Sequence, residues 1–126
     1  MAINHEWVSE KLLHTKYTGH VTGADMLAAA NDIAADPRME NIRFVIGDWS
    51  NIEQADIDPD DVRELAALII ALAKSFPGVK NASVVANYES GEARASLYDV
   101  LIQGTTWKAA TFGTVDDAKV WFDSSE

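Results

Sequence analysis

The sequence predicts an α/β fold, with a mixed, mainly parallel sheet flanked by four helices. Strand-like and helix-like patterns alternate along the chain in the order ββαβαβαβα, with short connections between them. The strands in the middle of the chain are continuous apolar runs, which are typical of parallel strands covered on both faces. Short strand–helix–strand units favour parallel neighbours and right-handed crossovers. We expect a single domain spanning residues 1–126.

The N-terminal segment predicts an antiparallel hairpin. A short strand at 7–9 precedes a longer one at 12–21. In the longer strand Leu13, Thr15 and Tyr17 share one face, whereas His14 and Lys16 share the other. This period of two indicates a half-exposed strand.

The three histidines of the chain are expected to be solvated surface residues of this hairpin. His14 and His20 fall on the same strand face, but six residues span about 20 Å along a strand, which is too far for a shared metal ion.

The first helix and the third strand follow. Thr22 and Asp25 have the spacing of a capping box, and Asp36-Pro37 ends the helix that they open. Residues 42–49 are then a buried strand centred on Val45.

The second helix has a strong start signal. Asp58 is its N-cap, Pro59 occupies its first position, and the helix ends near Phe76, before Pro77-Gly78. Residues 82–86 form the next strand.

The C-terminal third repeats the alternation. Ser90 is the predicted cap of a third helix that ends at Gly104. A last strand covers 107–112, and Thr114 opens the final helix.

Composition excludes several classes of function. The formal net charge of -10 disfavours binding to nucleic acid and electrostatic docking to anionic lipid. The absence of cysteine excludes disulfides and a thiolate nucleophile. The N-terminus carries no secretion signal, so we expect a cytoplasmic protein.

The second helix is unusual because residues 65–73 contain no polar side chain. A surface helix should carry a polar stripe. Either a neighbouring helix or a homodimer partner covers this face, or the helix is a movable lid over an apolar cavity that also makes transient, peripheral contact with a membrane. Ile70 lies off the main stripe. Burial of its side chain would indicate a covered face, and exposure would indicate an uncovered one.

We predict an apolar pocket between this helix and the sheet, since parallel sheets bind ligands at the carboxyl ends of their strands. The expected occupant is a small apolar molecule or a lipid. The predicted ligand-binding residues are Trp49, Leu65, Leu68, Ile69, Leu72, Phe76 and Tyr98.

The order of elements and the segment Gly47-Asp48-Trp49-Ser50 resemble the STAS domain, and most closely its SpoIIAA-like branch of small bacterial proteins. The resemblance covers nearly the whole chain. SpoIIAA-like proteins are similar in fold to the CRAL-TRIO lipid carriers, which implies a bound apolar ligand under a moving helix.

STAS domains of the anti-sigma-factor-antagonist type carry Asp-hydrophobic-Ser, a loop, and then Asp-Ser-Ser-Gly with a phosphorylated serine. Here Asp48-Trp49-Ser50 matches the first part, and Asp56 occupies the position of the loop aspartate. The next residues are Ile57-Asp58-Pro59, so the phosphoacceptor serine is absent. The alternative function is therefore a regulatory protein–protein interaction module without that switch. Its predicted partner-binding residues are Asp48, Ser50, Asp56 and Asp58.

No catalytic or metal-binding pattern is complete. The acidic run beginning at Asp56 lacks the glycine and the glutamate of a calcium loop. Ser50 lacks the Gly-x-Ser-x-Gly elbow of hydrolases. We therefore expect a non-catalytic protein without a metal or a cofactor.

Overall fold

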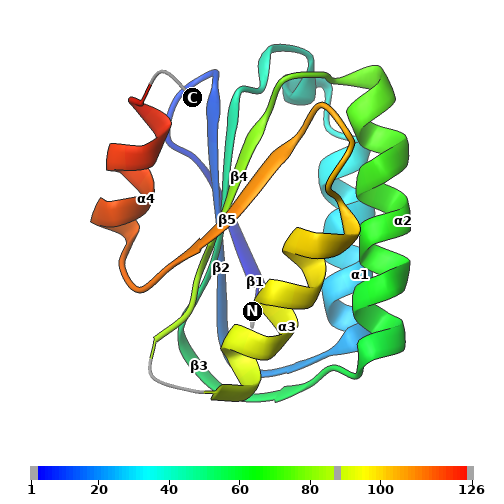
Figure 1. The fold of residues 1–126 in the computed structure, drawn as a ribbon, viewed down its shortest axis with the longest axis vertical. Helices are drawn as coiled ribbons and strands as arrows, with labels where there is room; N and C mark the ends of the chain where they lie inside the picture. Colours follow the sequence, from blue (N-terminus) through cyan, green and yellow to red (C-terminus); the bar gives the residue numbers. More distant parts are fainter. Residues whose placement is uncertain (1–2, 87–88, 125–126) are drawn as a thin grey trace.

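One five-stranded sheet, in the order β1-β2-β3-β4-β5, organises the computed structural model, which describes residues 3–86 and 89–124 (Figure 1). The strands are β1 (Ile3–Trp7), β2 (Leu12–Thr22), β3 (Phe44–Asp56), β4 (Lys80–Val84) and β5 (Lys108–Phe112). The first pair is antiparallel and the three later pairs are parallel. The predicted mixed, mainly parallel sheet is confirmed.

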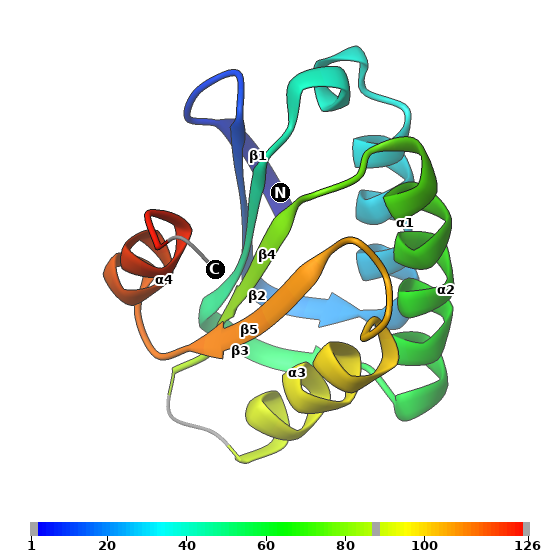
Figure 2. The ribbon, with the colours of Figure 1, turned by 45° about the horizontal axis from the view of Figure 1, so that its top comes forward.

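In the described part of the chain, four helices cover the two faces of the sheet unequally. They are α1 (Gly23–Ala34), α2 (Pro59–Ser75), α3 (Glu89–Leu101) and α4 (Val115–Phe122), with a 3₁₀ turn η1 (Pro37–Asn41) after α1. Figure 1 and Figure 2 show α1, α2 and α3 on one face and α4 on the opposite face. Each of the first three helices connects neighbouring parallel strands, so crossovers of one hand place them on the same side.

The predicted order of elements is confirmed, but several boundaries are wrong. The first strand runs from Ile3 to Trp7 instead of 7–9, because residues 8–11 form the turn of the hairpin, where the Val8 amide donates to the Leu12 carbonyl. The fourth strand begins at Lys80 instead of at residue 82. Helix α3 begins at Glu89, so Ser90 lies inside it and is not its cap.

Strand β3 differs most from its predicted bounds, because it continues to Asp56, whereas the sequence predicts its end at Trp49. Lys16 pairs with Asp48 and Thr18 with Asn51, so Trp49 and Ser50 together oppose a single β2 residue. A second shift follows where Gly19 pairs with Ile52 and His20 with Gln54. Two bulges therefore interrupt the strand, and the side-chain alternation reverses at each.

The sheet has a hydrophobic core on each face. The larger core lies under α1, α2 and α3 and includes Leu13, Val45 and Ile69. The smaller one lies under α4, where Ile46 and Phe122 pack together. Strand β3 contributes to both because successive side chains point to opposite faces.

Candidate functional site

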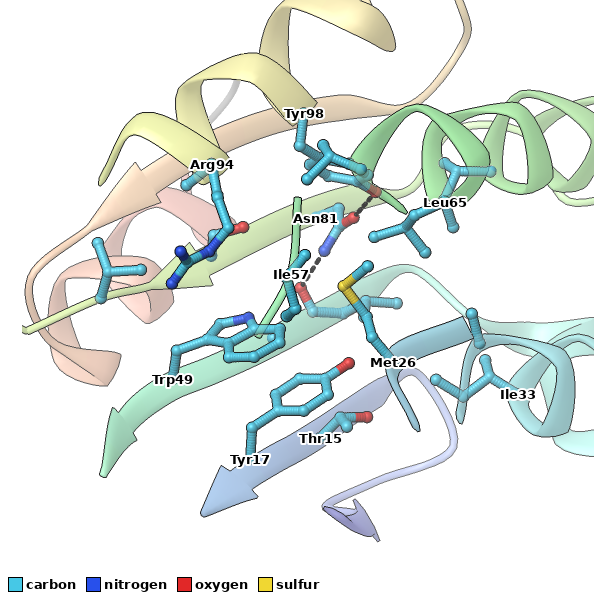
Figure 3. A pocket seen from close by; sticks show the side chains of 18 of the residues that line it. Thr15, Tyr17, Met26, Ile33, Trp49, Ile57, Leu65, Asn81, Arg94 and Tyr98 are labelled. Atoms are coloured by element: carbon cyan, nitrogen blue, oxygen red, sulfur yellow. Dashed lines mark hydrogen bonds between the residues drawn. The ribbon is translucent and has the colours of Figure 1, made fainter. Parts of the chain in front are cut away.

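A partly open cavity of about 110 Å³ lies between the sheet and the three helices on the same face (Figure 3). Strands β2, β3 and β4 form its floor, through residues such as Thr15, Val45 and Asn81. Met26 of α1, Ile69 of α2 and Tyr98 of α3 are among the residues that form its walls and roof. Most of the lining side chains are apolar, so the cavity suits an apolar molecule.

Not all of the predicted ligand-binding residues line this cavity. Those that do are Trp49, Leu65, Ile69, Leu72 and Tyr98. Leu68 is half-buried outside the lining, and so is Phe76, which lies just past the end of α2. The role of the lining residues in binding stays a prediction.

Leu68 lies outside the cavity lining because the buried face of α2 is rotated about the helix axis, relative to the stripe that the sequence predicts. The most buried residues of the helix are Val62, Ala66 and Ala73, with exposed fractions of 3%, 2% and 4%. Helix α2 packs between α1 and α3, and small alanines permit close approach of these neighbours. Neighbouring helices thus cover much of the apolar surface, which leaves Ala67, Ile70 and Ala71 outside.

Tyr17 and Trp49 form a wall of the cavity. Their rings stack with 3.8 Å between centroids and 6° between planes. The first bulge of β3 produces this contact, because it sets Trp49 and Ser50 opposite Tyr17. Bulges commonly re-aim side chains beside binding sites.

The cavity also contains polar groups. The Tyr98 hydroxyl donates to Asn81 Oδ1, and Asn81 Nδ2 donates to the Val45 carbonyl at 3.3 Å. The Tyr17 hydroxyl makes no hydrogen bond to any residue that the structure describes. Burial raises the pKa of both Tyr17 and Tyr98, so both hydroxyls stay protonated.

Several lining residues were not predicted from the sequence. Tyr17 and Thr15 could have been found, because the period of β2 already places them on the inward face with Leu13. Asn81 gave no such signal, since it is a polar residue next to an apolar run. Arg94 gave none either, since it lies in a mostly polar stretch.

Asp48, predicted to contact a partner, is instead buried on the α4 side of the sheet. It is 7% exposed, and its Oδ2 lies 2.8 Å from Nε2 of His14, which is 8% exposed. Its other oxygen accepts hydrogen bonds from the amide and the hydroxyl of Ser50, at 3.0 and 2.6 Å. The interpretation of His14 as a solvated residue is therefore wrong, because strand pairing places it against Asp48. His5 is half-buried and bonds the Thr15 hydroxyl at 2.9 Å.

These contacts determine the charge of Asp48. Burial by itself favours its neutral form. The hydrogen bonds from Ser50 and His14 outweigh burial and lower the pKa of the carboxyl below its ordinary value.

Ser50, Asp48 and His14 are not arranged as a nucleophilic triad. The serine hydroxyl and the imidazole bond opposite oxygens of the carboxylate, so Ser50 donates to Asp48 and not to His14. A serine nucleophile requires the histidine as its proton acceptor.

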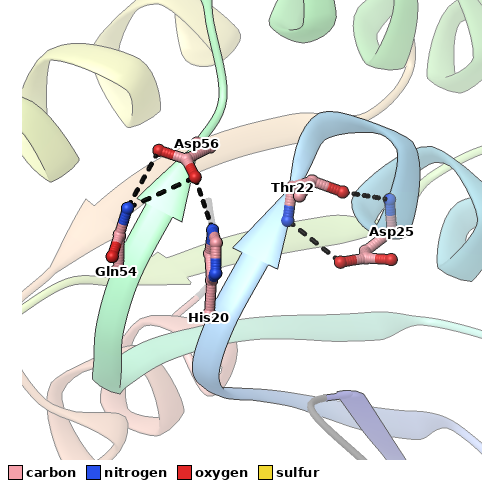
Figure 4. A network of polar contacts seen from close by, with 5 residues as sticks. All are labelled: His20, Thr22, Asp25, Gln54 and Asp56. Atoms are coloured by element: carbon pink, nitrogen blue, oxygen red, sulfur yellow. Dashed lines mark hydrogen bonds and ion pairs between the residues drawn. The ribbon is translucent and has the colours of Figure 1, made fainter.

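Asp56 and Asp58, the other predicted partner contacts, are exposed near the start of α2. Asp56 pairs with His20 and accepts from Gln54 at 3.3 Å, as Figure 4 shows. These hydrogen bonds lower the pKa of Asp56. Asp58 caps α2 in a capping box with Asp61. Both acids therefore have local structural partners.

Residues 3–86 and 89–124 contain no group of three or more metal-ligating side chains placed to hold a metal ion. Within the same ranges, no helix combines the length and the apolar character needed to cross a membrane.

No protein-family model matches this chain, and no curated protein matches it. A solved structure is similar over most of both chains: an uncharacterized protein of the DUF3478 family, with a SpoIIAA-like fold, from Shewanella loihica PV-4. The two share 16% sequence identity with a TM-score of 0.52, over 96% of this chain and 92% of the other. This chain therefore has a SpoIIAA-like fold.

Proposed function

We propose that this protein is a non-catalytic binding module that takes a small apolar ligand into the cavity between α2 and the sheet. The observation that carries the proposal is the cavity itself, with its mostly apolar lining and the Tyr17–Trp49 stack in its wall. Apolar pockets with a few convergent polar groups are the usual form of small-molecule sites.

The volume of the cavity limits the ligand. An engineered apolar cavity of about 150 Å³ in another protein holds benzene. The cavity here, at about 110 Å³, therefore matches a ligand built on a single small ring or a short branched chain, part of which extends through the open side.

A lipid with a long acyl chain exceeds this volume, so its binding requires α2 or α3 to move away from the sheet. Transient membrane contact would depend on the same movement. The apolar strip of Ala67, Ile70 and Ala71 on the outside of α2 supports such membrane contact, since Ile70 is 36% exposed. A ring-sized ligand needs no helix movement.

The test compares the wild type with Gly47→Ala. Gly47 lines the cavity, and a Cβ atom there would lie 3.7 Å from Trp49 Nε1 and 3.9 Å from the Ala82 carbonyl, which is ordinary contact. The added methyl group therefore occupies cavity space without a clash. Gly113→Ala is the matched control, because a Cβ at this exposed glycine meets no atom within 4 Å.

We expect toluene to raise the melting temperature of the wild type and of Gly113→Ala, and to do so less for Gly47→Ala. Native mass spectrometry should detect a retained small molecule in freshly purified protein. If toluene, fatty acids and branched short-chain acids all fail to bind by calorimetry, and no molecule is retained, the proposal is wrong.

The alternative is a regulatory protein-interaction module that docks a partner on the start and the outer face of α2. The exposure of Asp56, Asp58 and Ile70 favours it. It predicts that Ile70→Glu abolishes the interaction while Gly47→Ala leaves it unchanged. The ligand-binding proposal predicts instead that Gly47→Ala weakens ligand binding more than Ile70→Glu does.

A further inference from the structure

Arg94 is the charged residue at the cavity. Among the described residues that line it, Arg94 alone carries a charge, and all the others are apolar or neutral polar side chains. Figure 3 shows its guanidinium at the same end of the cavity as the Trp49 indole, whereas Leu65 and Ile33 lie at the other end.

Among the described residues, the guanidinium of Arg94 has no ion-pair or hydrogen-bond partner. This is notable in a protein with 20 acidic and 10 basic residues, where acidic partners are abundant. By comparison, Arg63 pairs with Asp60 at 2.8 Å. Arg38 pairs with Asp36 at 2.7 Å.

We infer that the ligand is a small apolar carboxylate, whose carboxylate pairs with Arg94 while its apolar body fills the cavity beside Tyr17 and Trp49. This inference rests on the proposed function. The planar fork of a guanidinium matches the two oxygens of a carboxylate and can bond both.

Two observations favour a carboxylate over a phosphate ester. Sites for phosphorylated ligands commonly use clusters of arginines, and here a single arginine lines the cavity among the described residues. The net charge of -10 also opposes a ligand with a double negative charge. A single carboxylate matches a single guanidinium.

The experiment measures binding of phenylacetate, phenylacetamide and toluene to the full chain by calorimetry at pH 7. These probes share one ring and differ in the group that would reach Arg94. We expect phenylacetate to bind about tenfold more tightly than phenylacetamide, because a hydrogen bond to a charged group stabilises a complex more than a neutral one does. Arg94→Gln should remove this preference.

Arg63→Gln is the matched control, since it makes the same change of net charge on α2, at an exposed arginine outside the lining. It should retain the preference for phenylacetate. The inference is wrong if wild type binds phenylacetamide as tightly as phenylacetate, if the preference survives Arg94→Gln, or if benzyl phosphate binds more tightly than phenylacetate.

The failure of this inference differs from failure of the proposed function. Binding of toluene without any preference for the carboxylate overturns the carboxylate assignment alone. Absence of binding by all of these probes overturns both.

Discussion

The rings of Tyr17 and Trp49 lie almost parallel and nearly on top of each other, with 3.8 Å between their centroids. Aromatic pairs generally prefer offset or edge-to-face arrangements with larger separations. This contact is therefore imposed by the backbone, where a bulge in β3 places Trp49 opposite Tyr17. The stack holds the Tyr17 hydroxyl inside the cavity, where no described residue bonds it.

The two cavity tyrosines should respond differently to loss of the hydroxyl. Tyr98→Phe leaves Asn81 Oδ1 buried without its donor, so we expect the free energy of unfolding to fall by about 1–3 kcal/mol. Tyr17→Phe removes a hydroxyl that no described residue bonds, and it should change stability by less than about 0.5 kcal/mol. Urea unfolding followed by circular dichroism measures both, and equal losses would contradict the assignment.

Gly23→Ala should destabilise the protein through the second helix. A Cβ on Gly23 would overlap the carboxylate of Asp61, which accepts from the Asp58 amide at 3.1 Å in the capping box of α2. We expect a loss of about 1–2 kcal/mol from disruption of this cap. Thermal unfolding of the variant and the wild type measures this loss. In the same experiment Gly113→Ala should be neutral or slightly stabilising, because a Cβ at Gly113 has open space around it.

Asp48 should make the protein sensitive to acid. Its pKa is lowered in the folded state, so the folded protein binds this proton less tightly than the unfolded chain does. The contribution to stability is present above the unfolded pKa of about 4 and is lost as the pH falls through the folded pKa. Between about pH 5 and about pH 3, a range that brackets the unfolded pKa, the unfolding free energy of Asp48→Asn should decrease less than that of the wild type. Denaturant titrations across this range test the slope.

Asp99 should act in the opposite direction. Burial raises its pKa, against the hydrogen bond from the Thr111 hydroxyl, and its Oδ1 is buried without a partner among the described residues. The folded state therefore binds this proton more tightly, and stability declines as the pH rises from the unfolded pKa through the folded one. Asp99→Asn keeps an acceptor for Thr111, so we expect it to remove this decline and to be at least as stable as wild type at pH 7. A variant less stable than wild type at every pH would contradict this.

The sequence predicts the fold well because local patterns determine it. The capping signals at Thr22, Asp58 and Thr114 place three helix starts correctly, and each side chain makes its capping hydrogen bond. The apolar runs around Val45 and Ala82 likewise identify two central strands. These signals involve residues close together in the chain, so one sequence is enough to read them.

The site is less predictable because it depends on contacts between distant residues. The bulges of β3 reverse the side-chain alternation after Trp49, and they arise from pairing with β2. The sequence pattern therefore predicts the end of the strand at Trp49, although the strand continues. The burial of His14 likewise depends on Asp48, 34 residues away. The orientation of α2 is set by packing against α1 and α3, which the spacing of its own leucines does not reveal.

The two ends of α2 are fixed to the rest of the molecule. At its C-terminal end, the Trp107 indole donates to the Phe76 carbonyl at 2.7 Å and the Thr106 hydroxyl to the Ala73 carbonyl at 3.2 Å. At its N-terminal end, Asp61 lies against Gly23 of α1. Lifting this helix would break all of these contacts.

Exchange of a small ligand should therefore proceed without displacement of α2. Rotation of the half-exposed Trp49 side chain would open the route, so substitution of Trp49 should change the dissociation rate and leave the amide hydrogen exchange of α2 unaltered.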